Sequence, residues 1–193
     1  MKNKILILLF FCLFSVSCND FLDTWEGYVI ENDAHYSHRS GLPPRVVSFK
    51  DGRHLVFDAR FDPSCLYDPS LLGQDGADIN KLYGFTDCNS LIHQNSARFG
   101  WRVVQDQKIE IFSYSYSNGK VDYHSMGFTE PNKVDHYEIW AKYDSYYFNF
   151  NGAEYESDRS KDCVHGLRVR LYPYFGGNAK APHRMEIFIY EYN

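Results

Sequence analysis

The sequence predicts an all-β protein, folded as an antiparallel two-sheet β-sandwich, and three observations support this fold class. Aromatic residues make up 18% of the 193 residues, and such residues favour strands over helices. Short runs that alternate apolar and polar residues recur along the chain, separated by turns rich in Gly, Asn and Asp. No stretch of the domain shows the period of a long helix. Strands at this spacing are typical of a sandwich or a closed barrel.

The N-terminal segment has the character of a secretion signal. Lys2 and Lys4 precede an apolar run over residues 5–14, which is too short to cross a bilayer as a stable helix. The run ends in the letters SVSC, which resemble the lipobox of bacterial lipoproteins, with Ser15 where that motif usually has Leu. The resemblance implies that Cys18 becomes the lipid-modified first residue. Ordinary secretion with cleavage nearby is the alternative.

Three segments follow from this reading: a lipoprotein signal peptide over 1–17, an anchor and acidic lead over 18–30, and one β-sandwich domain over 31–193. The expected location is the bacterial outer membrane, periplasmic or surface-exposed, with the lipid anchor as the only membrane contact. The net charge is -5, and it becomes -7 when the two signal lysines are removed. With no basic stripe to release counterions from phosphates, a nucleic-acid partner is not expected.

The first strands follow a break at Gly41–Pro44. Residues 45–49 alternate, Asp51-Gly52 gives a hairpin turn, and residues 54–61 form a second strand. That strand is expected to direct four side chains into the core: Leu55, Phe57, Ala59 and Phe61. Residues 61–88 are rich in Asp, Pro and Gly, so we expect a structured excursion with one short helical turn over one end of the sheet.

A strand over residues 96–103 has two different faces. One carries Ala97, Phe99, Trp101 and Val103 and is expected to be core, whereas the other carries Ser96, Arg98, Gly100 and Arg102. The remaining strands are a hairpin over 108–126 with a type I′ turn at Asn118-Gly119, a meander over 136–157 with turns near Asp144 and at Asn151-Gly152, and two last strands over 165–175 and 183–192.

Three segments of the chain together suggest a family: DINKLYGFTDC, NSARFGWR, and LYPYFGG followed by APH and an alternating final strand. They resemble bacterial surface lipoproteins with a concanavalin A-like jelly-roll domain, the fold of many lectins and glucanases. The resemblance covers about residues 30 to 193. It implies two antiparallel sheets with a concave face that often takes a sugar chain, and it does not by itself imply catalysis.

Some polysaccharide lyases of this jelly-roll type carry an Arg-rich strand, a Gln/His strand and a Tyr-Phe-Lys-Ala-Gly strand on the concave face. This chain is similar in part, with Arg98, Arg102, His93, Gln94, Tyr174 and Phe175. It departs from the pattern because no acidic residue separates the arginines, His and Gln stand in the opposite order, and no lysine follows Phe175. The ExDxxE carboxylates of glucanases are also missing from the sequence.

The expected ligand-binding residues are Arg98, Arg102, Tyr172, Tyr174, His183 and His35. The two arginines lie four residues apart on one strand face, so they either grip carboxylates and sugar hydroxyls or pair with acids on neighbouring strands. His35 and His183 converge if the first and last strands are neighbours, as a proton-transfer or metal pair, or each caps a strand. No catalytic residue is assigned.

Cysteine and acidic residues give few further predictions. Cys65, Cys88 and Cys163 allow at most one disulfide, whose pairing the sequence leaves open. They lack zinc-site spacing, so no metal site is predicted. The loop with Asp75, Asp78 and Asn80 carries oxygen ligands of the type that Ca²⁺ prefers, although a solvated loop with Asx turns is the simpler interpretation. No cofactor is expected otherwise.

The sequence favours a membrane-anchored lipoprotein that binds a carbohydrate or glycoconjugate on one sheet face. A binding protein is favoured over an enzyme. One alternative is a polysaccharide lyase acting on a uronate-containing glycan, with an arginine neutralising the uronate and a Tyr or His as base. A second is an assembly subunit that meets other surface lipoproteins through a tyrosine-rich face. A third is a lipid-binding β-barrel, because alternation alone does not separate a barrel from a sandwich.

Overall fold

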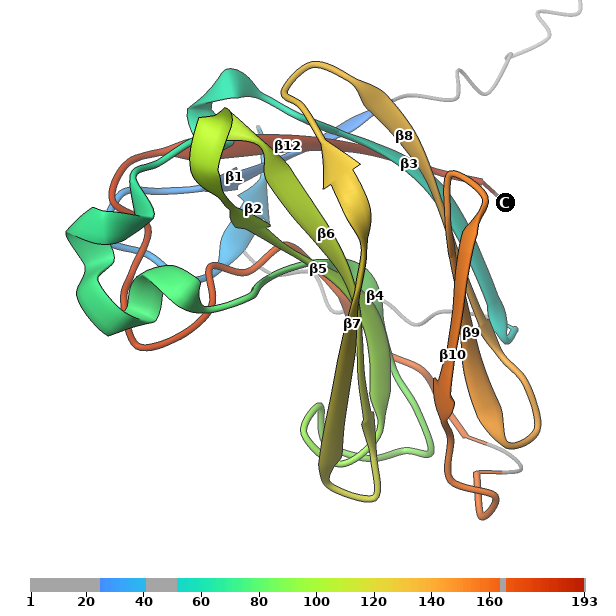
Figure 1. The fold of residues 1–193 in the computed structure, drawn as a ribbon. Helices are drawn as coiled ribbons and strands as arrows, with labels where there is room; N and C mark the ends of the chain where they lie inside the picture. Colours follow the sequence, from blue (N-terminus) through green and yellow to red (C-terminus); the bar gives the residue numbers. More distant parts are fainter. Residues whose placement is uncertain (1–24, 41–51, 164–165, 193) are drawn as a thin grey trace, which may run out of the picture.

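Two antiparallel β-sheets pack face to face in the computed structural model, which describes residues 25–40, 52–163 and 166–192. This arrangement confirms the predicted two-sheet sandwich of jelly-roll type (Figure 1). The signal peptide, Cys18 and the predicted strand at 45–49 lie outside the described residues. None of the short helical turns in the described residues has the length and apolarity needed to cross a membrane.

The larger sheet has seven strands in the order β10-β9-β8-β3-β12-β1-β2. Its strands are β1 Glu26–Ile30, β2 Ser37–Arg39, β3 His54–Phe61, β8 Val134–Ala141, β9 Ser145–Phe150, β10 Ala153–Asp158 and β12 Met185–Glu191. Because β1 pairs with β12 in the sheet, the folded domain includes part of the segment that the sequence assigns to the acidic lead.

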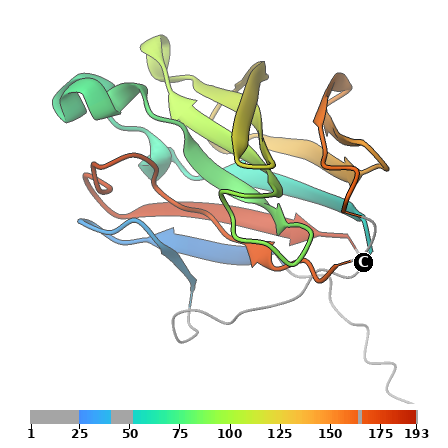
Figure 2. The same cartoon turned by 90° about the horizontal axis from the view of Figure 1, so that it is seen from below.

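The smaller sheet has five strands in the order β11-β4-β5-β6-β7, and it faces the larger sheet across the core (Figure 2). Its strands are β4 Asn80–Thr86, β5 Ser96–Val103, β6 Ile109–Ser117, β7 Lys120–Thr129 and β11 Arg170–Leu171. The predicted strand over 165–175 is regular only at β11. Beyond it, Tyr174 bridges both Tyr36 and Lys81 through the backbone, which joins this segment to β4.

Two tight turns form where the sequence predicts them. Asn118 and Gly119 have φ values of 51° and 80°, and Asn151 and Gly152 have 50° and 90°. A type I′ turn needs positive φ at both central residues, and Asn-Gly adopts it with little strain. These turns fix the registers of the β6–β7 and β9–β10 hairpins.

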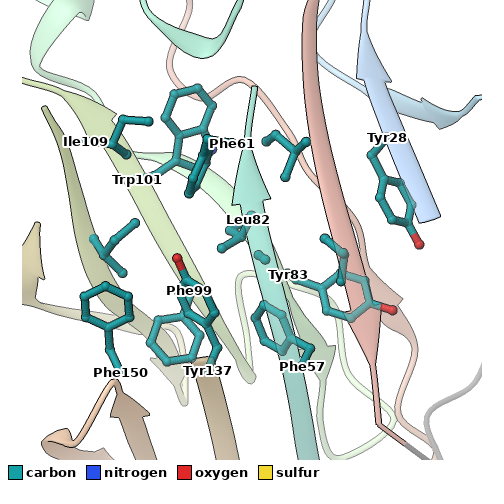
Figure 3. Packing of buried hydrophobic residues seen from close by; sticks show 14 of the residues in the cluster. Tyr28, Phe57, Phe61, Leu82, Tyr83, Phe99, Trp101, Ile109, Tyr137 and Phe150 are labelled. Carbon is teal, nitrogen blue, oxygen red and sulfur yellow. The ribbon is translucent and has the colours of Figure 1, made fainter. Parts of the chain in front are cut away.

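The core lies between the sheets, and the predicted inward faces of β3 and β5 both point into it. All eight side chains concerned are buried, each no more than 4% exposed. Figure 3 shows the aromatic centre of this core, where Phe57 stacks on Tyr137 with ring centroids 4.9 Å apart and Phe99 meets Tyr137 edge-on. A lipid-binding barrel would need a lined internal cavity, and the filled core between two sheets shows that alternative to be wrong.

The segment 61–88 contains more structure than the sequence predicts. After two 3-10 turns, η1 Pro63–Cys65 and η2 Pro69–Ala77, the chain enters β4, an inner strand of the five-stranded sheet. The prediction of a loop was wrong here because β4 is buried on both faces and therefore shows no alternation. A bulge between Lys81 and Gly84 also breaks the two-residue period.

Candidate functional site

Two adjoining hollows form a groove on the face of the five-stranded sheet that points away from the core. The first, here called the Arg98 pocket, has a volume of about 450 Å³, and its lining includes Lys81, His93, Arg98, Arg170, Tyr172 and Tyr174. The second, here called the Asp78 pocket, has a volume of about 260 Å³, and its lining includes Asp78, Lys81, Arg102, Tyr114, Tyr123 and Gly177. Lys81 lines both, so the two hollows meet at this side chain.

Strand register sets the floor of the groove. Arg98 on β5 pairs with Tyr114 on β6, which pairs with Tyr123 on β7, so the three side chains form one row across the sheet. Gly84 lies beside Arg98 on β4, and a Cβ at that position would come within 2.5 Å of the Arg98 Cα. Glycine therefore lets the two strands approach closely under the arginine.

Arg98 is a buried cation with no charged partner in the part of the chain that the structure describes. Its residue is 5% exposed, its Nε has no hydrogen-bond partner, and it forms no ion pair with any described residue. The guanidinium carbon lies 5.3 Å from the centroid of the Tyr114 ring. Burial lowers the pKa of Arg98 to about 10, which still leaves it charged at neutral pH. Buried charges are normally paired, so Arg98 is poised for an anion that enters the groove.

Lys81 lies next to this arginine and is 9% exposed. Its Nζ lies 4.1 Å from the centroid of the Tyr114 ring and donates a hydrogen bond to the backbone carbonyl of Ile79. Burial lowers the pKa of Lys81 from 10.5 to about 7, with the charge of Arg98 acting in the same direction and that of Asp78 opposing it. A lysine with such a pKa is partly unprotonated at neutral pH and can serve as a general base.

Tyr114 forms the floor below both cations. Burial raises its pKa above the ordinary 10, and a hydrogen bond with Tyr116 adds to that shift. Its hydroxyl therefore stays protonated at neutral pH and can donate a proton. The groove thus presents an uncompensated cation (Arg98), a potential base (Lys81) and a potential acid (Tyr114) on three adjacent strands. These groups together can bind a carboxylate and transfer a proton next to it.

One wall of the groove carries Tyr36 and Tyr174, whereas His35 lines neither pocket and packs behind Tyr174. Tyr174 stacks on the His35 ring at 5.3 Å and meets the Tyr36 ring edge-on at 5.0 Å. His35 is held by its Nδ1, which lies 2.9 Å from the carbonyl oxygen of Phe175. Tyr172, also predicted as a ligand residue, lines the Arg98 pocket while stacking on Tyr28 at the edge of the core.

Arg102 and His183, also predicted as ligand residues, are bound to other groups of the protein. Arg102 pairs with Glu110, with Nη2 lying 2.8 Å and Nε 2.9 Å from Oε2, so its charge is compensated within the sheet. The Nε2 atom of His183 lies 2.8 Å from the carbonyl oxygen of Ser64 in η1, and His183 lines neither pocket. His35 and His183 thus each bond to a different backbone carbonyl, which corresponds to the capping alternative.

Lys81 is the functional candidate that the sequence does not single out. It lies within the segment predicted as a loop, where a lysine reads as a solvated surface charge. The signal that could have identified it is its place just before Tyr83 and Phe85, two aromatic residues that favour a strand. The bulge after Lys81 then turns both Leu82 and Tyr83 into the core and leaves Lys81 on the groove face.

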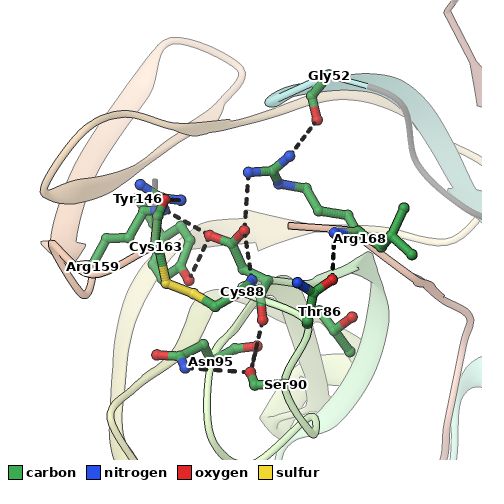
Figure 4. Close-up of polar contacts among 12 residues, drawn as sticks. Gly52, Thr86, Cys88, Ser90, Asn95, Tyr146, Arg159, Cys163 and Arg168 are labelled. Carbon is green, nitrogen blue, oxygen red and sulfur yellow. Dashed lines mark hydrogen bonds and ion pairs between the residues drawn. A yellow bond between two sulfur atoms is a disulfide. The ribbon is translucent and has the colours of Figure 1, made fainter. Parts of the chain in front are cut away.

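The cysteine pairing left open by the sequence is Cys88 with Cys163, whose Cα atoms are 4.9 Å apart, and Cys65 is free and buried. Asp87 lies close to this disulfide and makes ion pairs with Arg159 and Arg168, whose side chains Figure 4 labels. These groups therefore stabilise this end of the fold.

Of the acidic loop residues considered for Ca²⁺, Asn80 is 1% exposed and its Oδ1 accepts a hydrogen bond from the Gly176 backbone N–H. Calcium at this loop stays a prediction.

No protein-family model matches the chain, and no curated protein matches it in sequence. Solved structures do match in fold. Alginate lyase Aly36B aligns with a TM-score of 0.58 and 14% identity, over 86% of this chain and 78% of that enzyme. The family 7 alginate lyase A1-II′ aligns with a TM-score of 0.58 and 9% identity, over 88% of this chain and 78% of that enzyme. An alginate lyase from Pseudomonas aeruginosa aligns with a TM-score of 0.55 and 11% identity, over 89% of this chain and 98% of that enzyme.

At these identities the likeness shows the fold alone. One solved form of Aly36B has a lysine and a tyrosine replaced by alanine and is bound to an alginate tetrasaccharide. One solved form of A1-II′ has a tyrosine replaced by phenylalanine and is bound to product.

Proposed function

We propose that the protein is a polysaccharide lyase that cleaves a uronate-containing glycan by β-elimination. The observation that carries this proposal is Arg98, a buried guanidinium in an open groove that has no anionic partner among the described residues. A uronate carboxylate supplies that partner. Removing the weakly acidic proton at C5 is the central difficulty of the reaction, and neutralising the neighbouring carboxylate makes this proton more acidic.

Each step of the elimination has a group in the groove that can perform it. The unprotonated Nζ of Lys81 takes the proton from C5 of the uronate, and the electron pair that it leaves behind forms the C4–C5 double bond. The bond between C4 and the glycosidic oxygen then breaks, and the Tyr114 hydroxyl donates a proton to that oxygen. The products are a 4,5-unsaturated uronate and a new reducing end. Arg98 binds the carboxylate throughout, and no oxidant is consumed.

The structural comparisons support this proposal over binding alone, since the matched proteins are named as alginate lyases and two of them are solved with alginate oligosaccharides or product. A protein that only binds glycan would use the same groove, but it would not need a lysine with a lowered pKa beside an uncompensated arginine. Incubation with a panel of uronic-acid polymers separates the two, because a lyase releases products with ultraviolet absorbance whereas a binding protein only retards the polymer in an affinity gel.

The pH dependence of cleavage is expected to follow Lys81. Because the base form is needed, kcat/KM rises with pH through about 7, the pKa of Lys81. Replacing Lys81 with methionine removes this ascending limb and lowers kcat/KM by at least about 10²-fold, within the range for removal of a general base. The measurement is the initial rate of ultraviolet absorbance gain between pH 5 and 9.

A second readout of the same variant does not depend on activity. The folded pKa of Lys81 lies below its unfolded value of 10.5, so between pH 7 and 10.5 the unfolded state binds more protons and the free energy of unfolding rises with pH. Lys81→Met loses this rise, whereas Lys108→Met, at an exposed lysine, keeps it. If Lys81→Met kept both the rate and its pH profile, Lys81 would not be the base.

We further propose that the enzyme is exported and anchored through Cys18. The Cys88–Cys163 disulfide supports export, because disulfides persist in oxidising compartments. In bacteria fed a radiolabelled fatty acid, the full chain is expected to incorporate label and fractionate with membranes, whereas Cys18→Ser incorporates none and is released. Label retained by the Cys18→Ser chain would place the anchor elsewhere, and an unlabelled full chain would indicate ordinary secretion.

A further inference from the structure

The two halves of the groove carry different charges. In the Arg98 pocket, Arg98 is uncompensated, and the other arginine, Arg170, is paired with Glu191. In the Asp78 pocket, the charge of Arg102 is cancelled by Glu110, which also accepts a hydrogen bond from the Ser125 hydroxyl. Asp78 is therefore the carboxylate left without an ion pair among the described residues that line this second pocket.

The Asp78 carboxylate is held in place by its surroundings. Gly177 has a φ of 75°, and a Cβ built on it would lie 1.9 Å from Oδ2 of Asp78. The carboxylate thus packs directly against the glycine backbone, in space that any other residue at this position would fill. The negative charge of Asp78 also acts on Lys81, where it raises the pKa and so partly offsets the lowering by burial. The carboxylate lies half-buried, beside the base, in the pocket wall.

Lys81 lines both pockets, so a sugar chain that places one residue at Arg98 and Lys81 directs the next residue into the Asp78 pocket. A second uronate there would bring its carboxylate towards that of Asp78, and like charges at contact distances repel strongly where water is partly excluded. A neutral sugar meets no such repulsion. Its hydroxyl groups can donate hydrogen bonds to the carboxylate, which accepts them at both oxygens.

From this charge asymmetry we infer that the site selects a glycan in which a uronate alternates with an uncharged sugar, with the uronate at Arg98 and the uncharged sugar at Asp78. The inference rests on the lyase function proposed above and narrows its substrate class. A homopolymer of uronate, which would place an anion in both pockets, is then the poorer substrate. Asp78 is the residue that determines this specificity.

The test uses the mature protein and two groups of polymers. The homopolyuronates are polymannuronate, polyguluronate, polygalacturonate and glucuronan, and the alternating polymers are hyaluronan and unsulfated chondroitin. Ultraviolet absorbance of the unsaturated product reports kcat/KM on each. We expect at least one alternating polymer to be cleaved about tenfold or more faster than every homopolyuronate. Asp78→Asn is expected to reduce this ratio about tenfold, mainly through KM for the homopolyuronates, since the amide keeps the shape and removes the charge.

Asp106→Asn serves as the matched control, because Asp106 is exposed in η3 Gln105–Gln107 and lines neither pocket. Faster cleavage of a homopolyuronate by the unmodified protein, or a ratio that Asp78→Asn leaves unchanged, would overturn the inference while leaving the lyase function standing. If no polymer gives an unsaturated product, the lyase function fails instead. Affinity gels then test the charge preference separately: retardation by alternating polymers alone supports it, and equal or stronger retardation by homopolyuronates overturns it.

Discussion

Replacing Arg98 with alanine is expected to lower kcat/KM for cleavage of the uronate polymer by about 10²- to 10³-fold, the range seen when one preorganised group that stabilises developing charge is removed. Arg98 is 5% exposed and has no competing carboxylate among the described residues, so its charge is available to the substrate. Arg98→Lys is expected to recover only part of the loss, because an ammonium group does not present the planar fork that binds a carboxylate through two hydrogen bonds.

Protein stability distinguishes this functional role from a structural one. Removing one partner of a buried ion pair is costly because the other charge is left buried and unpaired, whereas removing a buried charge that has no partner relieves a desolvation cost. The free energy of unfolding of Arg98→Ala is therefore expected to equal or exceed that of the unmodified protein while activity is lost. Urea denaturation measures it. A variant that loses stability and activity together would show that Arg98 supports the fold.

Arg60→Ala is the matched control for Arg98. Arg60 lies on β3 of the seven-stranded sheet, where its guanidinium stacks over the Phe188 ring at 4.4 Å and donates a hydrogen bond to Asn132. It shares the residue type and a strand position but lines neither pocket. Its replacement is expected to leave kcat/KM within about twofold. A loss comparable to that of Arg98→Ala would mean that net charge, not position in the groove, controls cleavage.

The sequence predicts the parts of this fold that depend on local pattern. The inward faces of β3 and β5 follow from strict alternation, and the Asn118-Gly119 turn follows from the need for positive φ at both positions. Arg98 is placed on the correct face for the same reason. The alternation cannot distinguish it from Arg102, because the difference between them is a single acceptor, Glu110, on the neighbouring strand.

What the sequence misses depends on contacts between distant segments. Lys81 becomes a candidate base only because β4 is an inner strand, because the bulge turns its successors inward, and because Tyr174, 93 positions later, bridges its backbone. Burial then lowers its pKa. The pairing of Cys88 with Cys163 likewise joins segments 75 residues apart, and no local pattern specifies which of three cysteines remains free.

Asp87 follows β4 directly and forms a buried ion-pair network with Arg159 and Arg168, both of which Figure 4 labels. No local sequence pattern predicts this network. Asp87 is 0% exposed, and its carboxylate lies 2.6 Å from Nε of Arg159 and 3.0 Å from Nη2 of Arg168. Tyr146 on β9 also donates a hydrogen bond to it. The network links the end of β4 to the segments that follow β10 and precede β11.

Asp87→Ala is expected to lower the free energy of unfolding by about 3–5 kcal/mol, the cost of leaving a buried ion pair without one partner. Here two arginines lose their anion, with side chains 1% and 7% exposed, so water cannot replace it without opening the sheets. Asp87→Asn is expected to cost nearly as much, since it keeps the shape and the acceptor but not the charge. Urea denaturation with the Cys88–Cys163 disulfide intact measures both, so that the change reports the contacts of Asp87 and not loss of the disulfide.

Asp33→Ala is the matched control, because Asp33 pairs with Lys180 at 3.1 Å but its side chain is 75% exposed. An exposed pair contributes between about 0 and 1 kcal/mol, since water solvates both charges when the pair is broken. Comparing the two losses therefore shows how much more an ion-paired carboxylate costs to remove when it is buried between two arginines than when it is exposed beside one lysine. A loss below about 1 kcal/mol for Asp87→Ala would mean that the arginines find new partners, and that the disulfide alone holds this end of the sandwich together.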